Sequence, residues 1–173
     1  SKVSYDLLTQ CGLPSPRTSY IKLYINNEYK GLYIHIEHFD EEYIQKRFPN
    51  DHTGNLFKCF YGSDLTYHGT NPTYYQNTYK LKTNEVVNDY SGLIHLIEVL
   101  YNSANANFVC EIQDVFDVDS YLRTLAVEIL IGQWDGYAYN KNNYFLYERP
   151  SDGKFIFMEY DLDNTFGIDW FNV

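Results

Sequence analysis

The chain has 173 residues, of which 45% are apolar, so it is long enough to bury the core of a single domain. Its formal net charge of -10 comes from 13 Lys and Arg against 23 Asp and Glu, which argues against nucleic acid as a partner. No apolar run reaches the roughly 18 residues that a transmembrane helix needs, so we expect no membrane insertion. Ser1 already stands in an amphipathic segment and few residues follow Gly167, so we expect one domain, 1–173, truncated at both ends.

Helix and strand patterns alternate in the first third of the chain. Residues 2–10 have apolar side chains at helical spacing, and the Gly and Pro residues that follow end a helix. Residues 20–25 and 31–38 alternate on either side of an Asn-Asn-Glu turn, which predicts an antiparallel hairpin. Residues 40–48 have acidic side chains in the first turn and basic ones in the last, which predicts a short helix with charges matched to its dipole.

The middle of the chain is less regular. Residues 54–60 predict a further strand. Residues 61–88 are rich in Gly, Thr, Asn and Tyr without a sustained period, so we interpret them as an irregular insertion with one short strand at 78–81. Residues 91–100 then return to helical spacing.

A second long helix is predicted to begin at Asp117 or Asp119 and to stop at Gly132. Its expected buried stripe consists of Leu122, Leu125, Ala126, Ile129 and Leu130. This helix leads directly into a polar loop that contains Asp135, and a rigid helix is a good support for functional side chains.

The last segment predicts an aromatic hairpin. Residues 144–148 and 155–160 flank a Pro-Ser-Asp-Gly turn, and Asp161 follows the second strand. With the helices before it, this hairpin indicates the α+β class, with antiparallel hairpins and packed helices.

The order of polar residues around this hairpin is that of a protein-kinase active site. Asp135 is a candidate for the base that orients an acceptor hydroxyl, and Asp161 and Asp163 are candidate Mg²⁺ ligands at a strand end. Asn140 has the kinase spacing from Asp135, whereas Asn143 directly precedes the strand as the kinase Asn does, so both remain candidate metal or nucleotide ligands. The alternatives are structural: a turn cap for Asp135 and an Asx turn for Asp161.

Other residues admit several interpretations. Lys58 is a candidate partner of ATP phosphates, held by Glu37, or simply an exposed lysine of a strand. Residues 161–165 also match the DxDxT motif of haloacid-dehalogenase phosphatases, in which the first Asp is the nucleophile. The three cysteines, Cys11, Cys59 and Cys110, have no metal or redox spacing and fit either one disulfide with a free thiol or small apolar side chains.

Four motifs in order make the chain resemble the CotH family of atypical, spore-coat-type protein kinases. These are residues 26–33 with Glu37, residues 54–58, Asp135 with residues 142–147, and residues 160–167. The chain departs from the pattern of protein kinases by lacking a GxGxxG loop and a His-Arg pair before Asp135. It also departs from the family pattern, because Tyr160 replaces the family's common Trp.

The resemblance implies a divergent protein-kinase-like fold that uses ATP and Mg²⁺ to phosphorylate Ser residues of coat or surface proteins. It also implies a location that is extracellular, at the cell surface or in the spore coat, with a surface protein as a partner. A non-catalytic secreted surface or adhesion module with the same fold is the alternative. The expected truncation puts the activity of such a kinase on its own in question.

Overall fold

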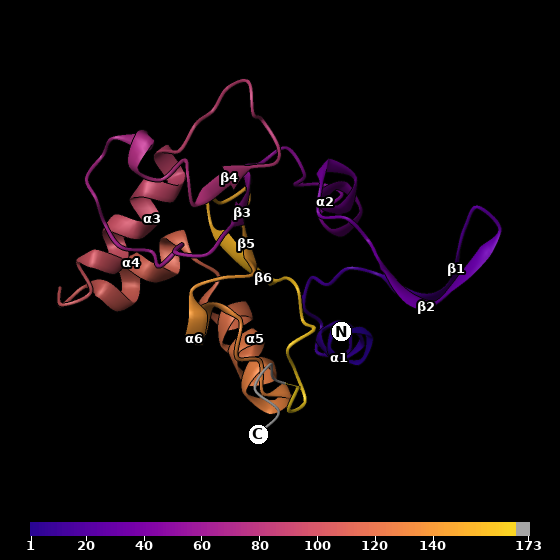
Figure 1. The fold of residues 1–173 in the computed structure, drawn as a ribbon. Coiled ribbons are helices and arrows are strands. Elements are labelled where there is room, and N and C mark those ends of the chain that lie inside the picture. The colour runs from indigo at the N-terminus through magenta and orange to yellow at the C-terminus, as the bar shows by residue number, and fades with distance from the viewer. Residues whose placement is uncertain (169–173) are drawn as a thin grey trace.

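The computed structural model of the chain describes residues 1–168 and shows an α+β protein (Figure 1). Its elements in order are α1 (Lys2–Gln10), β1 (Thr18–Ile25), β2 (Glu28–Ile36), α2 (Glu41–Arg47), β3 (Leu56–Cys59), the 3-10 helix η1 (Pro72–Tyr74), β4 (Tyr79–Leu81), α3 (Ser91–Tyr101), α4 (Phe108–Val115), α5 (Val118–Ile131), α6 (Tyr137–Asn140), β5 (Tyr144–Glu148) and β6 (Phe155–Glu159). The strands form two antiparallel sheets, and most elements agree with the sequence patterns to within a few residues. Helix α4 was not predicted.

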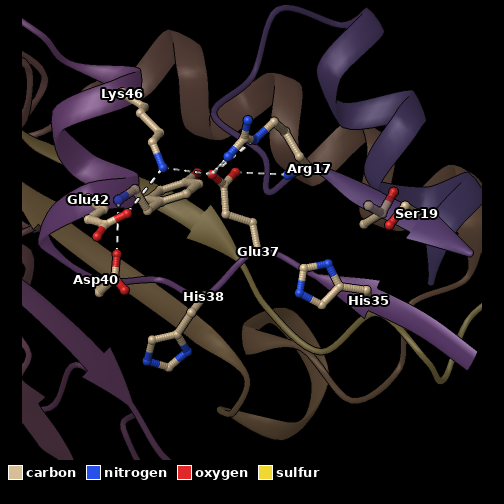
Figure 2. A pocket seen from close by; sticks show the side chains of 10 residues that line it. Arg17, Ser19, His35, Glu37, His38, Asp40, Glu42 and Lys46 are labelled. Carbon is tan, nitrogen blue, oxygen red and sulfur yellow. Dashed lines mark hydrogen bonds and ion pairs between the residues drawn. The ribbon is translucent and has the colours of Figure 1, made fainter. Parts of the chain in front are cut away.

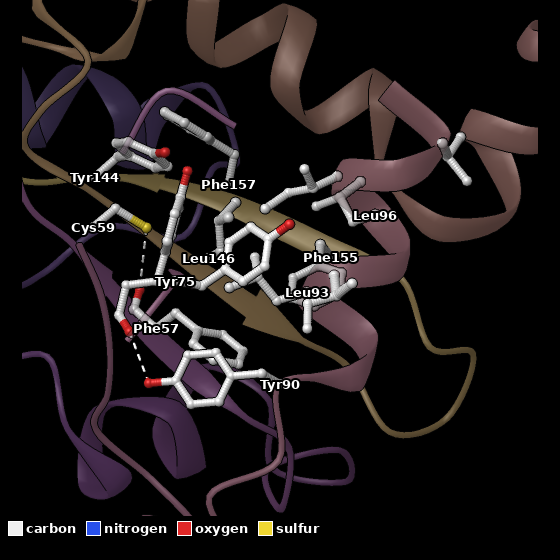
Figure 3. Packing of buried hydrophobic residues seen from close by; sticks show 14 of the residues in the cluster. Phe57, Cys59, Tyr75, Tyr90, Leu93, Leu96, Tyr144, Leu146, Phe155 and Phe157 are labelled. Atoms are coloured by element: carbon white, nitrogen blue, oxygen red, sulfur yellow. Dashed lines mark hydrogen bonds between the residues drawn. The ribbon is translucent and has the colours of Figure 1, made fainter. Parts of the chain in front are cut away.

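The central sheet has four strands in the order β4-β3-β5-β6. β5 and β6 are buried along nearly their whole length, which requires side chains on both faces to be apolar. On one face Phe57, Leu146 and Phe157 pack with Leu93 and other residues of α3 (Figure 3). On the other face Leu56, Phe145 and Ile156 pack against Phe39 and α2. The sheet is therefore a two-sided support for the loops at its ends.

A third apolar cluster connects α1, α5 and the segment after β6. It contains Tyr5 and Leu8 from α1, Val127 and Ile131 from α5, and Leu162, which is fully buried. Leu162 lies between Asp161 and Asp163, so its burial fixes the backbone from which both carboxylates project.

The β1–β2 hairpin differs from the central sheet because it projects away from the rest of the fold (Figure 1). Its pairing is as predicted, with a bulge between Leu23 and Tyr24. Almost every residue of both strands is exposed or only partly buried, including Tyr24 and Leu32 at 57% and 62% exposure. The alternating pattern therefore predicted the strands correctly without indicating a buried face.

The predicted buried stripe of α5 is wrong. Leu122, Ile129 and Leu130 are 57%, 74% and 72% exposed. The buried face is instead formed by Ser120, Thr124, Val127, Glu128 and Ile131. Because this face contains Ser, Thr and Glu where it meets α1 and β6, hydrophobicity alone selected the opposite side of the helix.

The segment 61–88 is irregular, yet it contributes to the core. Its strand β4 pairs with β3 from Tyr79 to Leu81, and Tyr75 and Tyr79 are almost fully buried. All three cysteines are free thiols, with Cys59 buried and the other two exposed. Within residues 1–168, no helix has both the length and the apolar character needed to cross a bilayer.

Candidate active site

Helix α5 places Asp135 by ending in a left-handed glycine. Gly132 has φ of 65°, and its backbone N–H closes the helix on the carbonyls of Glu128 and Ile129. The Ile131 carbonyl, left free at the helix end, accepts a 2.6 Å hydrogen bond from the N–H of Phe166. The end of α5 is therefore tied to the segment that follows β6, and the two loops of the candidate site are held together.

The Asp135 carboxylate is buried at 7% exposure and accepts hydrogen bonds from three amides. Asn140 Nδ2 donates to Oδ1 at 2.6 Å, and Asn143 Nδ2 donates to Oδ2 at 2.8 Å and to the backbone oxygen at 3.1 Å. Asn164 Nδ2 lies 3.4 Å from Oδ2. The sequence did not decide between Asn140 and Asn143, and both contact Asp135. Asn164 was not predicted, although it stands within the recognised motif.

The loop between α6 and β5 needs unusual backbone conformations to bring these amides together. Lys141 and Asn143 both have left-handed backbones, with φ of 54° and 56°. Asn adopts this region more readily than most residues, and here it also supplies the donor to Asp135. The Asn143 carbonyl in turn accepts a hydrogen bond from the N–H of Tyr160, which joins the loop to the end of β6.

Asp161 and Asp163 follow β6 and are both exposed. Asp161 lies two residues beyond the end of β6 and has a left-handed backbone with φ of 55°, so the chain turns there. Partial burial of its carboxyl group raises the pKa of Asp161, and the charges of Asp163 and Asp135 add to the effect while Lys58 opposes it. Asp163, Asp135 and Lys58 therefore all lie within electrostatic reach of Asp161.

Lys58 lies on β3 with its ammonium group over aromatic rings. Its Nζ is 4.4 Å from the centre of the Tyr160 ring and 5.1 Å from that of Phe60. These contacts hold the amine near the end of β6, on the side where Asp161 follows.

Glu37 has other partners than the one expected for it (Figure 2). Its carboxylate accepts hydrogen bonds from Arg17 Nη2 at 2.6 Å and Arg47 Nη2 at 2.8 Å, while Lys46 Nζ lies 3.8 Å away. Desolvation opposes ionisation, but the hydrogen bonds of Arg17 and the charges of both arginines lower the pKa of Glu37 to about 2. The expected Glu37–Lys58 pair is therefore wrong among the described residues, because two arginines occupy this carboxylate.

The residues around Glu37 line a pocket of about 410 Å³ between β1, β2 and α2. Arg17, His35 and Lys46 contribute to its walls together with Glu37 and Glu42. Cations and carboxylates are mixed there, so the pocket has no single sign of charge.

Metal-binding capacity in the described chain is limited to small groups of ligands. Within residues 1–168, no three His, Cys, Asp or Glu side chains converge on one point. Mg²⁺ in phosphoryl-transfer sites needs only one or two protein carboxylates, because phosphates and water complete its octahedron. Asp161 and Asp163 meet that smaller requirement.

Three matches place the chain among known proteins. The family model described as CotH kinase protein matches residues 1–172. Invasin CotH2 of Rhizopus delemar is 31% identical over 95% of this chain and 29% of its own length. Inner spore coat protein H of Bacillus subtilis is 30% identical over 98% of this chain and 46% of its own length. The chain thus spans less than half the length of either relative. With nearly all of its residues matched, the chain belongs to the CotH family.

Proposed function

We propose that the chain carries the catalytic centre of an Mg-ATP-dependent atypical protein kinase that phosphorylates Ser residues of coat or surface proteins. The observation that carries the proposal is the Asp135 carboxylate, oriented by Asn140 and Asn143 and within electrostatic reach of Asp161. Phosphoryl transfer depends mainly on positioning and electrostatics, which such an arrangement supplies. The order of α5, loop, β5, β6 and Asp161 supports a divergent kinase-like fold.

Each side chain of the site has a role that its surroundings favour. Asp135 would accept the hydrogen bond of an incoming serine hydroxyl and aim it, because its amide contacts fix the plane of the carboxylate. Asp135 is only 7% exposed, so a substrate would contact one edge of its carboxylate. Asn140 and Asn143 would keep that edge in place, and the Asn carbonyl oxygens would remain for a ligand.

The donor set also fits the cation that the family implies. Asp161 and Asp163 present exposed carboxylates beside the charge of Asp135, and the pKa of Asp161 is raised first by partial burial and then by the charges of Asp163 and Asp135. Mg²⁺ bound there with ATP would neutralise charge that develops on the phosphates. Lys58 would bind a phosphate oxygen from the other side, since its charge already reaches Asp161. A nucleotide contact for Glu37 stays a prediction.

Transfer of labelled phosphate tests this proposal. The full-length protein, incubated with magnesium and γ-labelled ATP, should label serine residues of surface or coat proteins, as identified by mass spectrometry. Asp135→Asn should reduce labelling about 10²- to 10⁴-fold while preserving ATP binding. Glu42→Gln, which changes an exposed carboxylate of α2, is the matched control and should retain activity. Equal labelling by the Asp135→Asn protein would refute the assignment of the base.

A non-catalytic surface module is the second candidate. The names of several relatives, including Invasin CotH2 and Invasin CotH3, support it, as does the exposed aromatic hairpin of β1 and β2. This candidate predicts capture of a surface protein that Asp135→Ala leaves unchanged. The non-catalytic candidate would be contradicted if Asp135→Ala lost the captured protein and the wild-type protein labelled serine residues.

The phosphatase alternative has less support. Its motif places Asp161 as a nucleophile, but residues 161–165 lie inside the match to the CotH family model, which covers residues 1–172. No acyl-phosphate on Asp161 is expected after incubation with phosphate esters, which hydroxylamine trapping would check.

A further inference from the structure

The turn that follows β6 is closed by a buried threonine of the same motif. Thr165 is 1% exposed, and its Oγ1 donates a hydrogen bond to the carbonyl oxygen of Leu162 at 3.2 Å. Leu162 stands between Asp161 and Asp163 and is fully buried. A hydroxyl that bonds the backbone three residues earlier holds a turn in one conformation. Thr165 therefore supports the backbone from which both carboxylates project.

A serine of α1 supports Thr165 in turn. The two hydroxyl oxygens lie 3.1 Å apart, and Ser4 is fully buried in the first turn of the helix. A hydroxyl has one hydrogen to donate, and that of Thr165 is used on Leu162, so Ser4 is the donor of this pair. Hydrogen bonds therefore run from the Ser4 hydroxyl through the Thr165 hydroxyl to the Leu162 carbonyl oxygen.

Helix formation and packing do not account for the hydroxyl of Ser4. Alanine forms helices better than serine, and a buried hydroxyl is unfavourable unless it is hydrogen-bonded. Among the described residues, the side chain of Ser4 has Thr165 as its one hydrogen-bond partner. The contact with the turn after β6 is therefore what favours serine at this position of α1.

Helix α1 is itself fastened to α2. Ser15 Oγ donates to the carbonyl oxygen of Tyr5 at 3.0 Å, and Arg47 Nη2 donates to the carbonyl oxygen of Ser15 at 2.8 Å. Arg47 lies in the last turn of α2 and also pairs with Glu37. Tyr5 packs in the same apolar cluster as Leu162. These contacts give the hydroxyl of the neighbouring Ser4 a fixed position.

The turn needs support before a cation is bound. Asp161 has a left-handed backbone, which residues other than Gly adopt only when the surroundings enforce it. Partial burial raises the pKa of Asp161, and the charges of Asp163 and Asp135 raise it further, so like charges repel one another at this turn. Mg²⁺ requires a near-ideal octahedron of oxygens. A turn that relaxed under this repulsion would therefore bind Mg²⁺ more weakly.

We propose that Ser4 is a positioning residue for the cation-binding turn. Through the hydroxyl of Thr165 it fixes the backbone of Leu162, and so the placement of the Asp161 and Asp163 carboxylates for Mg²⁺. This inference rests on the proposed function, because it takes these two carboxylates as the magnesium ligands. Ser4 acts through Thr165 and is not a catalytic residue.

Backbone amide exchange and magnesium titration of the full-length protein test the proposal. Ser4→Ala removes the donor to Thr165, so without metal the amides of residues 161–167 should exchange about tenfold faster than in the wild type. The Mg²⁺ concentration that half-saturates ATP binding should also rise about tenfold, as when outer partners of metal ligands are removed.

Variants of Thr165 test the same contact from the other side. Thr165→Ser keeps the hydroxyl and should retain the magnesium dependence of the wild type, whereas Thr165→Val should weaken it as Ser4→Ala does. Because both changes break one chain of hydrogen bonds, the Ser4→Ala, Thr165→Val double variant should lose little more than either single variant. Fully additive losses would show that the two hydroxyls act independently and would overturn the proposal.

Leu93→Ala separates positioning from a general loss of stability. Leu93 is fully buried in α3, in a cluster that contains no residue of the turn. Its unfolding midpoint should fall while the magnesium dependence stays that of the wild type. If Ser4→Ala also lowers only the unfolding midpoint, its role is merely structural and the proposal is overturned. A wild-type protein that binds no Mg·ATP would instead overturn the proposed function, and the magnesium role of Ser4 with it.

Discussion

Two carboxylate groups near the end of α5 differ in how their charge is satisfied. Asp135 is buried and accepts hydrogen bonds from amides on both of its oxygens. Glu128, in the last turn of α5, is buried against Glu159, and burial and the neighbouring carboxyl group raise the pKa of Glu159 well above its ordinary value. Glu37 is an intermediate case, because two arginines pair with it at a half-open surface. A buried acid with fixed neutral donors is suited to orient a substrate, whereas two buried acids in contact are satisfied by holding a proton between them.

The largest effect is expected at Asp135. Asp135→Asn keeps the size of the side chain but replaces the acceptor oxygen that would face a serine hydroxyl. Phosphoryl transfer should fall about 10²- to 10⁴-fold, as for other positioned acid–base groups. Steady-state kinetics with the full-length protein would measure this. A change of less than a few-fold would mean that Asp135 is only a turn cap.

Glu37 is a carboxylate whose charge is paired with two arginines. Its pKa lies below the ordinary 4.5, at about 2, so the ionised form stabilises the fold. This stabilisation is complete above pH 4.5 and is lost as the pH falls toward 2. Because Arg17 is mostly exposed and solvent screens it, we expect only about 1–3 kcal/mol.

Urea unfolding of Glu37→Gln would measure this contribution. The variant should be less stable than the wild type at pH 6, and the difference should shrink at pH 3. A difference that grows on acidification would contradict the assigned sign.

The amide donors of Asp135 can be removed one at a time. Asn143→Ala leaves the buried oxygen Oδ2 without its 2.8 Å partner, so the free energy of unfolding should fall by about 1–3 kcal/mol. Asn164→Ala removes only the 3.4 Å contact and should cost less. Chemical denaturation of both variants would rank them. Equal losses would show that the two amides support Asp135 to the same degree.

The smallest effect is expected on the exposed side of α5. Ile129 is 74% exposed, although its spacing predicted a buried position. Ile129→Ser should change stability within about 0.5 kcal/mol, whereas Ile131→Ala, on the buried face, should cost about 2–5 kcal/mol. Thermal unfolding would compare them. A large loss at Ile129 would mean that this face is covered in the folded protein.

Periodicity and turn residues predicted the strands and most of the helices because those features are local. The hairpin of β5 and β6 is an example, since its Pro-Ser-Asp-Gly turn and aromatic strands need no distant partner to be recognised. The buried face of α5 could not be found in this way, because Thr124 and Glu128 face the core while Leu130 faces outward. Their positions depend on where α1 and β6 pack.

The candidate site shows the same division. The spacing of Asp135, Asn140 and Asn143 indicated their proximity, because only the short helix α6 and its flanking turns separate them. The two partners of Glu37 were not predicted: the pairing of β1 with β2 brings Arg17 to it, and the packing of α2 brings Arg47. The Glu128–Glu159 pair also depends on a crossing between distant segments. Each of the two side chains lies in an otherwise regular element and carries no local signal.

The most direct test of the account is calorimetry of Mg·ATP binding to the full-length protein, because every assigned role depends on a nucleotide meeting Asp161 and Asp163. We expect the wild type to bind and Asp161→Ala to lose magnesium-dependent binding, with Glu42→Gln unchanged as the control. Absence of Mg·ATP binding by the wild-type protein would contradict the proposed kinase function. Equal binding by Asp161→Ala would contradict the metal assignment alone.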